Sequence, residues 1–192
     1  MIDLRNRELI LASASPRRAW LMTELGVPFT VQPKHAEEVY SDLLKKEEIP
    51  LYLAKLKADA FTEKEVEKKI ILTADTVVWL NGKELQKPTD LEDAKRMIGQ
   101  LSGTSHEVYT GIHLRTTDQA ISDFDRTVVH FKKLSDDEID YYVENYKPLD
   151  KAGAYGIQEW IGYIGIEKIE GCYFNVMGLP LRKVYNALKS LS

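Results

Sequence analysis

Residues 8–26 read ELILASASPRRAWLMTELG, and this stretch sets the expected fold class. Its first half is short and aliphatic and ends in small residues, which predicts a buried β-strand. Its second half predicts an α-helix, because Ser15 can cap it, Pro16 suits its first turn and Gly26 can end it. A second short strand is expected over residues 27–33, VPFTVQP. The opening is therefore a strand–helix–strand unit, typical of α/β proteins.

The rest of the chain mixes helical and strand-like patterns. Helices are expected over residues 50–69, 89–103, 135–146 and 179–191. Strands are expected over residues 70–80 and 162–169, and an antiparallel hairpin over residues 106–134. Together these elements predict one mixed sheet with flanking helices, in a single domain (residues 1–192) with two lobes around a cleft.

The composition is that of an ordinary globular protein, with 44% hydrophobic and 29% charged residues. The net charge of -4 argues against a broad basic surface for nucleic acid. The single cysteine, Cys172, cannot form an internal disulfide, which favours a reducing compartment. The sequence has neither the apolar run of a signal peptide nor one long enough to span a bilayer. We therefore expect a cytoplasmic protein with no nucleic-acid or membrane partner.

Common catalytic motifs are absent from the sequence, which contains no HExxH, no GxxxxGK[ST] and no GxSxG. The adjacent Arg17 and Arg18 instead follow a strand-to-helix turn. Free backbone N–H groups and the helix dipole favour anions at such a turn, and arginine matches phosphate oxygens. The alternative is a polar cap followed by two solvated arginines, and the pattern alone leaves both interpretations open.

Asp75 interrupts the apolar strand LTADTVVWL, residues 72–80. A buried carboxylate is costly unless it is paired or bound to a metal. Because the strand continues beyond it, we expect Asp75 in an ion pair or an active-site wall rather than in a turn. Taken one at a time, the other candidate charges would be ordinary surface groups: Lys57, Lys87, Lys151 and the pair Glu37–Glu38.

Four stretches, in order along nearly the whole chain, carry a family resemblance. They are residues 9–29 (LILASASPRRAWLMTELGVPF), 72–112 (LTADTVVWLNGKELQKPTDLEDAKRMIGQLSGTSHEVYTGI), 148–158 (PLDKAGAYGIQ) and 169–181 (IEGCYFNVMGLPL). Together they resemble the Maf family of nucleoside triphosphate pyrophosphatases. The resemblance implies an α/β fold related to the inosine triphosphate pyrophosphatases, commonly a homodimer. It also implies hydrolysis of a nucleoside triphosphate to a monophosphate and pyrophosphate with a divalent cation, Mg²⁺ or Mn²⁺.

The resemblance also implies roles for individual residues. The expected substrate-binding residues are Ser13, Arg17, Arg18, Lys57 and Lys87. The expected metal ligands are Glu38 and Asp75, and Asp75 is also the expected catalytic residue. The motifs SPRR, ADT and YGIQ are similar to those of the dTTP/UTP enzymes, so the expected specificity residues are Arg18, Thr76 and Gln158. The chain departs from the family pattern at four positions: Ala14, Glu159 and Trp160, where glycine is frequent, and Cys172, where serine is frequent.

Three alternatives remain open at this point. Asp75 could accept a proton from the attacking water, or it could act chiefly through the metal and by orienting the water. The substrate could be a modified or methylated nucleoside triphosphate. The chain could also be a nucleotide-binding regulator of cell division without turnover, although the full set of acidic and basic positions argues against this.

Overall fold

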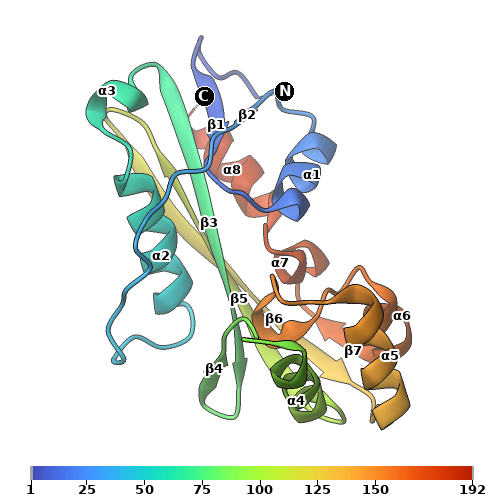
Figure 1. Cartoon of the computed structure of the whole chain (residues 1–192). Helices are drawn as coiled ribbons and strands as arrows, with labels where there is room; N and C mark the ends of the chain where they lie inside the picture. Colours follow the sequence, from blue (N-terminus) through green and yellow to red (C-terminus); the bar gives the residue numbers. More distant parts are fainter. Residues whose placement is uncertain (1, 192) are drawn as a thin grey trace. The chain divides into compact units, whose positions relative to one another are not determined.

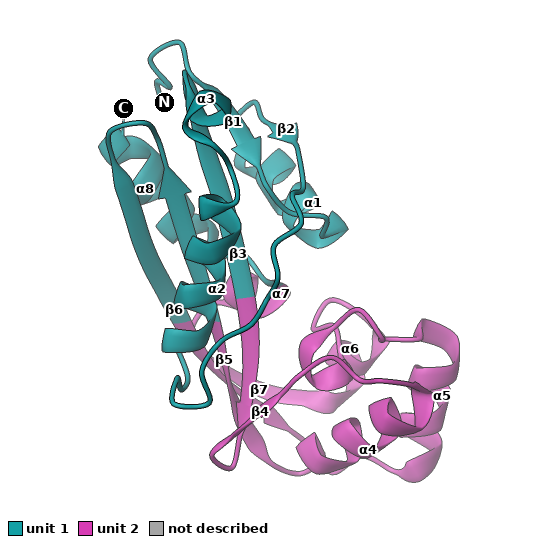
Figure 2. Cartoon of the chain, turned by 60° about the vertical axis from the view of Figure 1, so that its left-hand side comes forward, with its two compact units in different colours: residues 1–75, 110–125, 178–192 teal, residues 76–109, 126–177 magenta. Residues whose placement is uncertain are grey.

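The computed structural model describes residues 2–191, and the chain divides into two compact units (Figure 2). Unit 1 comprises residues 1–75, 110–125 and 178–192, and unit 2 comprises residues 76–109 and 126–177. The description of the chain as a single domain with two lobes stays a prediction.

Three long strands contribute residues to both units: β3 (Lys69–Leu80), β5 (Ser105–Arg115) and β6 (Ala120–Phe131). The other elements of unit 1 are β1 (Glu8–Leu11), α1 (Pro16–Leu25), β2 (Thr30–Val31), α2 (Glu48–Asp59), α3 (Glu63–Val66) and α8 (Leu181–Leu191). Those of unit 2 are β4 (Lys83–Leu85), α4 (Leu91–Leu101), α5 (Asp136–Tyr146), the 3₁₀ helix η1 (Ala152–Ala154), α6 (Trp160–Gly165), β7 (Ile166–Glu170) and α7 (Tyr173–Met177).

Among the described residues, the strands form one sheet in the order β2-β1-β3-β5-β6-β7, with β4 also paired to β3. Strand β1 runs parallel to β2 and β3, whereas β4 is antiparallel to β3 and β7 is antiparallel to β6. In unit 1, α2 lies on one side of β3, and α1 and α8, which pack together, lie on the other (Figure 1). The predicted mixed sheet with flanking helices is confirmed.

Local capping signals place most helix ends where the sequence predicts them. The Ser15 hydroxyl accepts a hydrogen bond from the backbone N–H of Arg18 at the start of α1, and Gly26 ends that helix with φ 72°. At the start of α5, Ser135 and Glu138 form the predicted capping box. Caps depend on residues three or four positions apart, so the sequence alone was sufficient to locate them.

Two predicted elements differ from the structure. The helix expected over residues 50–69 is broken after Asp59, because Thr62 caps a separate helix, α3, through a capping box of its own. The strand expected over residues 162–169 begins as α6, and only its second half joins β7. In both cases a short-range apolar pattern did not reveal the break.

A close backbone approach fixes α2 against β5 within unit 1. A Cβ atom on Gly111 would lie 2.5 Å from the carbonyl carbon of Pro50 and 2.6 Å from its oxygen, so no side chain fits there. One face of α2 is buried, through Ile49, Leu53, Ala54 and Ala58 among others. This contact sets the position of the helix that carries Lys57.

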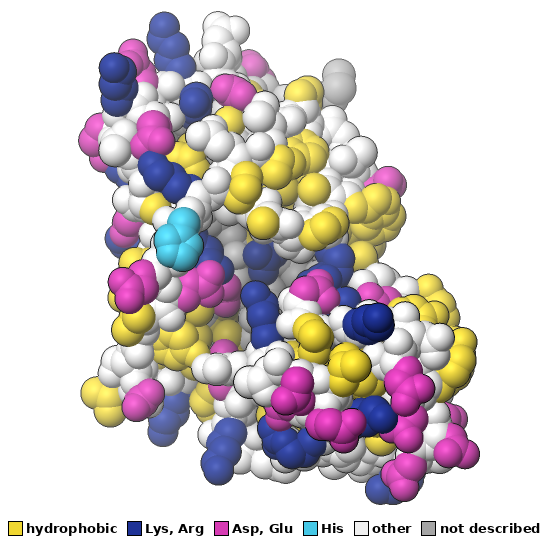
Figure 3. Space-filling view, in the orientation of Figure 1, with side chains coloured by type: hydrophobic (Ala, Val, Ile, Leu, Met, Phe, Trp, Pro, Cys, Tyr) yellow, Lys and Arg dark blue, Asp and Glu magenta, His cyan; other side chains and the backbone are white. Residues whose placement is uncertain are grey.

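The exposed surface mixes charges of both signs, as the face in Figure 3 shows. None of the helices described between residues 2 and 191 combines the length and the apolar character that crossing a membrane requires.

Unit 2 buries a histidine in an aromatic cluster. His106 is 2% exposed, its Nε2 lies 2.7 Å from the Tyr155 hydroxyl, and its ring lies against Phe131. Its Nδ1 is buried without a hydrogen-bond partner among residues 2–191. Burial, together with the nearby His130, lowers the pKa of His106 from its ordinary 6.5 to about 3.

The His106 site predicts that the protein loses stability in acid. Between about pH 6.5 and 3, the unfolded chain binds a proton that the folded chain excludes, so the free energy of unfolding should fall by up to ~1.4 kcal/mol per pH unit as pH decreases. Urea unfolding from pH 8 to 4.5 measures this dependence. His106→Gln should show a shallower slope, whereas substitution of the exposed His35 by Gln should not. Equal slopes in the wild type and His106→Gln would contradict this explanation.

Candidate active site

The turn between β1 and α1 in unit 1 gathers three of the predicted substrate-binding residues. Ser13 is 9% exposed, and its hydroxyl accepts hydrogen bonds from the backbone N–H of Ser15 (3.3 Å) and from Nη1 of Arg18 (3.3 Å). Arg17 is partly exposed at the start of α1. The start of α1 and a serine–arginine pair thus lie together at one turn, where the backbone N–H of Arg18 is already bonded to the Ser15 hydroxyl.

The guanidinium of Arg18 is directed into the unit. Its Nε donates to the carbonyl oxygen of Gly178 at 2.8 Å, and its Nη1 donates to that of Ala74 at 2.8 Å. Burial lowers the pKa of Arg18, and the nearby Asp75 opposes this change. Arg18 therefore connects helix α1 to the residue that precedes Asp75. Its direct contact with a substrate stays a prediction.

Strand geometry explains where the Asp75 side chain is directed. Side chains two positions apart in a strand share a face. The Thr73 hydroxyl donates to the carbonyl oxygen of Ala54 in α2 at 2.7 Å, so this face of β3 meets α2. Asp75 lies on the same face, and Lys57 follows Ala54 by about one helical turn. The strand and the helix therefore bring Asp75 and Lys57 together.

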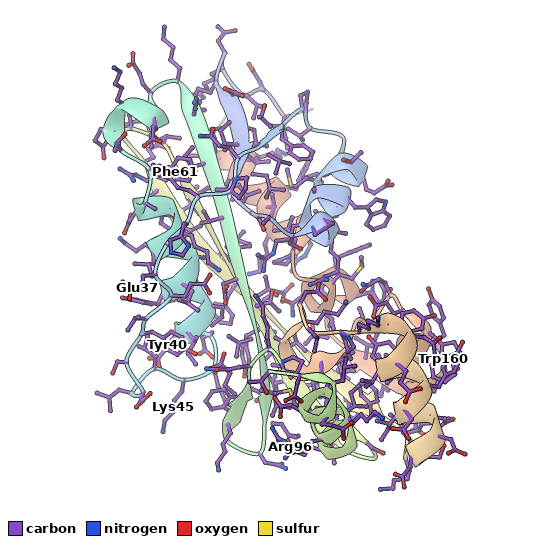
Figure 4. All side chains as sticks on the ribbon, in the orientation of Figure 1. Glu37, Tyr40, Lys45, Phe61, Arg96 and Trp160 are labelled. Atoms are coloured by element: carbon purple, nitrogen blue, oxygen red, sulfur yellow. The ribbon has the colours of Figure 1, made fainter. Side chains whose placement is uncertain are left out.

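Lys57 lies between two of the predicted carboxylates. Its Nζ is 2.5 Å from Oδ1 of Asp75 and 3.1 Å from Oε1 of Glu38, which comes from the irregular segment before α2. The Asp75 and Lys57 side chains are 14% and 16% exposed, and Glu38 is 50% exposed. The carboxylate inside the apolar strand is thus paired, as its cost of burial requires. Figure 4 places the neighbouring Glu37 in the same segment.

The two carboxylates have the chemistry that a hard divalent cation prefers. Glu38 and Asp75 offer oxygen donors directed at one positive group, the Lys57 ammonium. No cluster of three or more His, Cys, Asp or Glu side chains suited to a metal occurs within residues 2–191. Glu38 and Asp75 are therefore the carboxylates that would hold a cation here.

The remaining predicted residues belong to unit 2. Thr76 directly follows Asp75 in β3, and Lys87 is exposed in the segment after β4. Gln158 is partly exposed just before α6, and its Oε1 is buried without a hydrogen-bond partner among residues 2–191. The roles of these three residues stay predictions.

Sequence reasoning missed a polar group in unit 2. Lys151, which was interpreted as a surface lysine, is 8% exposed and lies 3.1 Å from Glu159. Tyr142 of α5 donates its hydroxyl hydrogen to the same carboxylate. The available signal was Glu159 itself, a charged residue followed by apolar Trp160 and Ile161.

Comparisons with known proteins show which family the chain belongs to. A relative from Phocaeicola vulgatus named dTTP/UTP pyrophosphatase is 50% identical over 190 residues, 98% of both chains. One of the same name from Flavobacterium johnsoniae is 49% identical over 188 residues, 98% of this chain and 97% of its own. Among solved structures, the Staphylococcus aureus Ham1 protein aligns with a TM-score of 0.49 and 13% identity, over 65% of this chain and 72% of its own, which is too weak to support a conclusion. The family model described as Maf-like protein matches residues 8–191. The resemblance is confirmed, and the chain belongs to the Maf family.

Proposed function

We propose that this chain hydrolyses dTTP and UTP to the nucleoside monophosphate and pyrophosphate. The observation that carries the proposal is the convergence of Asp75, Lys57 and Glu38, beside the arginine-bearing turn of α1. Relatives that are about half identical over the full chain, and that are named for this activity, support it.

In the proposed reaction, water attacks the α-phosphorus, and the bond from that phosphorus to the oxygen bridging to the β-phosphate breaks. Pyrophosphate leaves with the electron pair of that bond. The substrate carries several negative charges, so fixed cations should stabilise both the bound triphosphate and the leaving group. We assign this task to Arg17, Arg18, Lys57 and Lys87, with Ser13 as a hydrogen-bonding neighbour.

Asp75 is the proposed catalytic residue. It would receive a proton from the attacking water or orient that water, and Lys57 holds one of its two carboxylate oxygens. The ion pair keeps the carboxylate in place between two elements of unit 1. Glu38 and Asp75 would hold Mg²⁺ or Mn²⁺, which would supply positive charge at the phosphate oxygens.

Base selection is assigned to Gln158, with Thr76 and Arg18 as further candidates. Uracil and thymine present a carbonyl–imide–carbonyl edge, and a carboxamide offers both a donor and an acceptor to read it. The buried, unpartnered Oε1 of Gln158 supports this role.

The proposal extends to the setting of the enzyme. We propose a homodimer in the cytoplasm with no nucleic-acid or membrane partner. The net charge of -4 supports the absence of a nucleic-acid partner, and the single cysteine supports a reducing compartment.

A substrate panel tests the proposed activity. The purified protein should release pyrophosphate from dTTP and UTP, but much less from dCTP, GTP or 7-methyl-GTP, and only when magnesium or manganese is present. Chelation by EDTA should abolish the signal, and re-addition of the metal should restore it. Faster pyrophosphate release from a modified purine nucleotide than from dTTP or UTP would show the same reaction with a different base preference. Binding of dTTP without any metal-dependent product would favour a regulator without turnover.

The catalytic assignment is tested by Asp75→Asn. This variant keeps the shape of the side chain but removes the charge that faces Lys57, and we expect kcat to fall by about 100- to 10,000-fold. Binding of dTMP, followed by calorimetry, should persist. The matched control is Asp123→Asn, which removes another aspartate of unit 1 that is paired with a lysine, Lys183, at 2.9 Å. Near-normal pyrophosphate release from a folded Asp75→Asn variant would reject the assignment.

The base-reading assignment is tested by Gln158→Ala. Loss of the carboxamide should lower the ratio of kcat/KM for dTTP over dCTP by about tenfold or more, because a buried base edge would lose its hydrogen-bond partner. The rates on the two substrates, measured side by side, give this ratio. An unchanged ratio would show that Gln158 does not read the base.

A further inference from the structure

The residue that follows Gln158 has an unusual set of partners within unit 2. Glu159 occupies the N-cap position of α6, yet its side chain makes no capping hydrogen bond. Its Oε2 accepts a hydrogen bond from the Tyr142 hydroxyl, and its Oε1 pairs with Nζ of Lys151 at 3.1 Å. The Glu159 and Lys151 side chains are only 19% and 9% exposed. This carboxylate therefore makes tertiary contacts in place of the local contact that its position favours.

Tyr142 connects both ends of the segment 156–159. Its oxygen accepts a hydrogen bond from the backbone N–H of Gly156 at 3.0 Å while its hydroxyl donates to Glu159. Burial, and then the adjacent Glu159 carboxylate, raise the pKa of the Tyr142 phenol, so the hydroxyl keeps the proton that it donates. Through this one oxygen atom, the start and the end of the segment are held to helix α5.

The backbone between these two ends is also fixed. A Cβ atom on Gly162 would lie 1.9 Å from the carbonyl oxygen of Ile157, so the segment packs directly on the backbone of α6. The Tyr163 hydroxyl donates to the carbonyl oxygen of Gln158 at 2.5 Å. Trp160, the first residue of α6, packs on Tyr141 of α5 with ring centroids 4.7 Å apart, and Figure 4 shows it beside that helix. The main chain of Gln158 is therefore anchored on both sides.

The side chain of Gln158 is left with an unused acceptor. Its Oε1 is buried and has no hydrogen-bond partner among residues 2–191. Its Nε2 lies close to Gly156, 3.0 Å from where a Cβ atom would be. A buried acceptor without a partner costs free energy, and a ligand that donates a hydrogen bond would recover it.

We propose that Glu159 is a positioning residue for base selection: through Tyr142 and Lys151 it fixes the segment 156–159, so that Gln158 presents its amide oxygen to the base. This inference rests on the proposed function. The ligand group that fits is the imide N–H of uracil or thymine, which is a donor. Cytosine carries a ring nitrogen acceptor at the same place, and two acceptors facing each other repel. A carboxamide free to turn by half a rotation would present its NH₂ group and lose this discrimination.

The test uses Glu159→Gln, which keeps the size of the side chain but removes one of the two charges that face Lys151, the other being Asp150 at 2.8 Å. It also uses Tyr142→Phe, which removes one hydroxyl. Each should lower the dTTP-over-dCTP ratio of kcat/KM by about tenfold, because a small displacement of the Gln158 carboxamide weakens its discrimination between the bases. The control is Glu107→Gln, because Glu107 is also 19% exposed in unit 2 and is paired with Arg126. The dTTP-over-dCTP ratio of kcat/KM for Glu107→Gln should equal that of the wild type.

A double variant separates positioning from stability. If Glu159 acts through Gln158, then adding Glu159→Gln to Gln158→Ala should change the base ratio no further, although the melting temperature still falls. A lower melting temperature with an unchanged base ratio in both Glu159→Gln and Tyr142→Phe would overturn the inference. The inference would also be overturned if Glu159→Gln lowered the base ratio by the same factor in the Gln158→Ala variant as in the wild type.

Equilibrium binding of dTMP and dCMP distinguishes this inference from the proposed function, because neither product can be cleaved. If the wild type hydrolyses dTTP but Glu159→Gln keeps the full preference for dTMP, the activity stands and the positioning role is rejected. If the wild type releases no pyrophosphate but binds dTMP over dCMP, with a preference that Glu159→Gln lowers, the positioning role stands and the activity is rejected. Equal binding of both nucleotides by the wild type rejects the positioning role.

Discussion

The ion pair between Asp75 and Lys57 is the constraint on which the organisation of unit 1 depends. A carboxylate that follows the buried residues Ile70–Ala74 of β3 would be strongly destabilising without a positive partner. The partner must come from another element and must approach closely. Helix α2 supplies it, and the absence of a side chain at Gly111 allows that helix to approach the sheet.

Two independent connections converge on residues 73–75 and hold this pair in register. On one side, the Thr73 hydroxyl binds the carbonyl oxygen of Ala54, one turn before Lys57. On the other, Arg18 binds the carbonyl oxygen of Ala74 and so attaches helix α1 to the same short stretch.

The two arginines that open α1 therefore differ. Arg18 is bonded to the backbone of the fold, whereas Arg17 is partly exposed at the turn. The proposed polyanion site needs cations that stay in place before the ligand arrives, and an arginine bonded to main-chain carbonyls would meet that need.

The sequence predicted those features whose causes are local. The cap at Ser15, the capping box at Ser135 and the glycine end of α1 were all recognisable because each depends on neighbours three or four residues apart. Helix α6 was missed because it needs Gly162 to lie against Ile157, a packing relation that strand-like apolar spacing conceals. For the site, the residue types of Asp75, Lys57 and Glu38 were recognised, and the structure shows them in contact. Burial of Lys151 was missed because its partner Glu159 is held by Tyr142 of α5, a contact between separate elements.

Charge and base recognition make different physical demands on such an enzyme. Every nucleoside triphosphate carries the same triphosphate, so cations that contact only its phosphate oxygens stabilise all of them alike and cannot discriminate between bases. Discrimination needs a group at the base edge whose donor and acceptor stand in a fixed order. A carboxamide has both, but its two ends are nearly the same size, and a half rotation reverses its preference. A glutamine therefore selects between bases only if its surroundings hold the carboxamide in one orientation. The charged pair of Glu159 and Lys151, together with the Tyr142 hydroxyl, provides rigidity beside Gln158, the residue proposed to read the base.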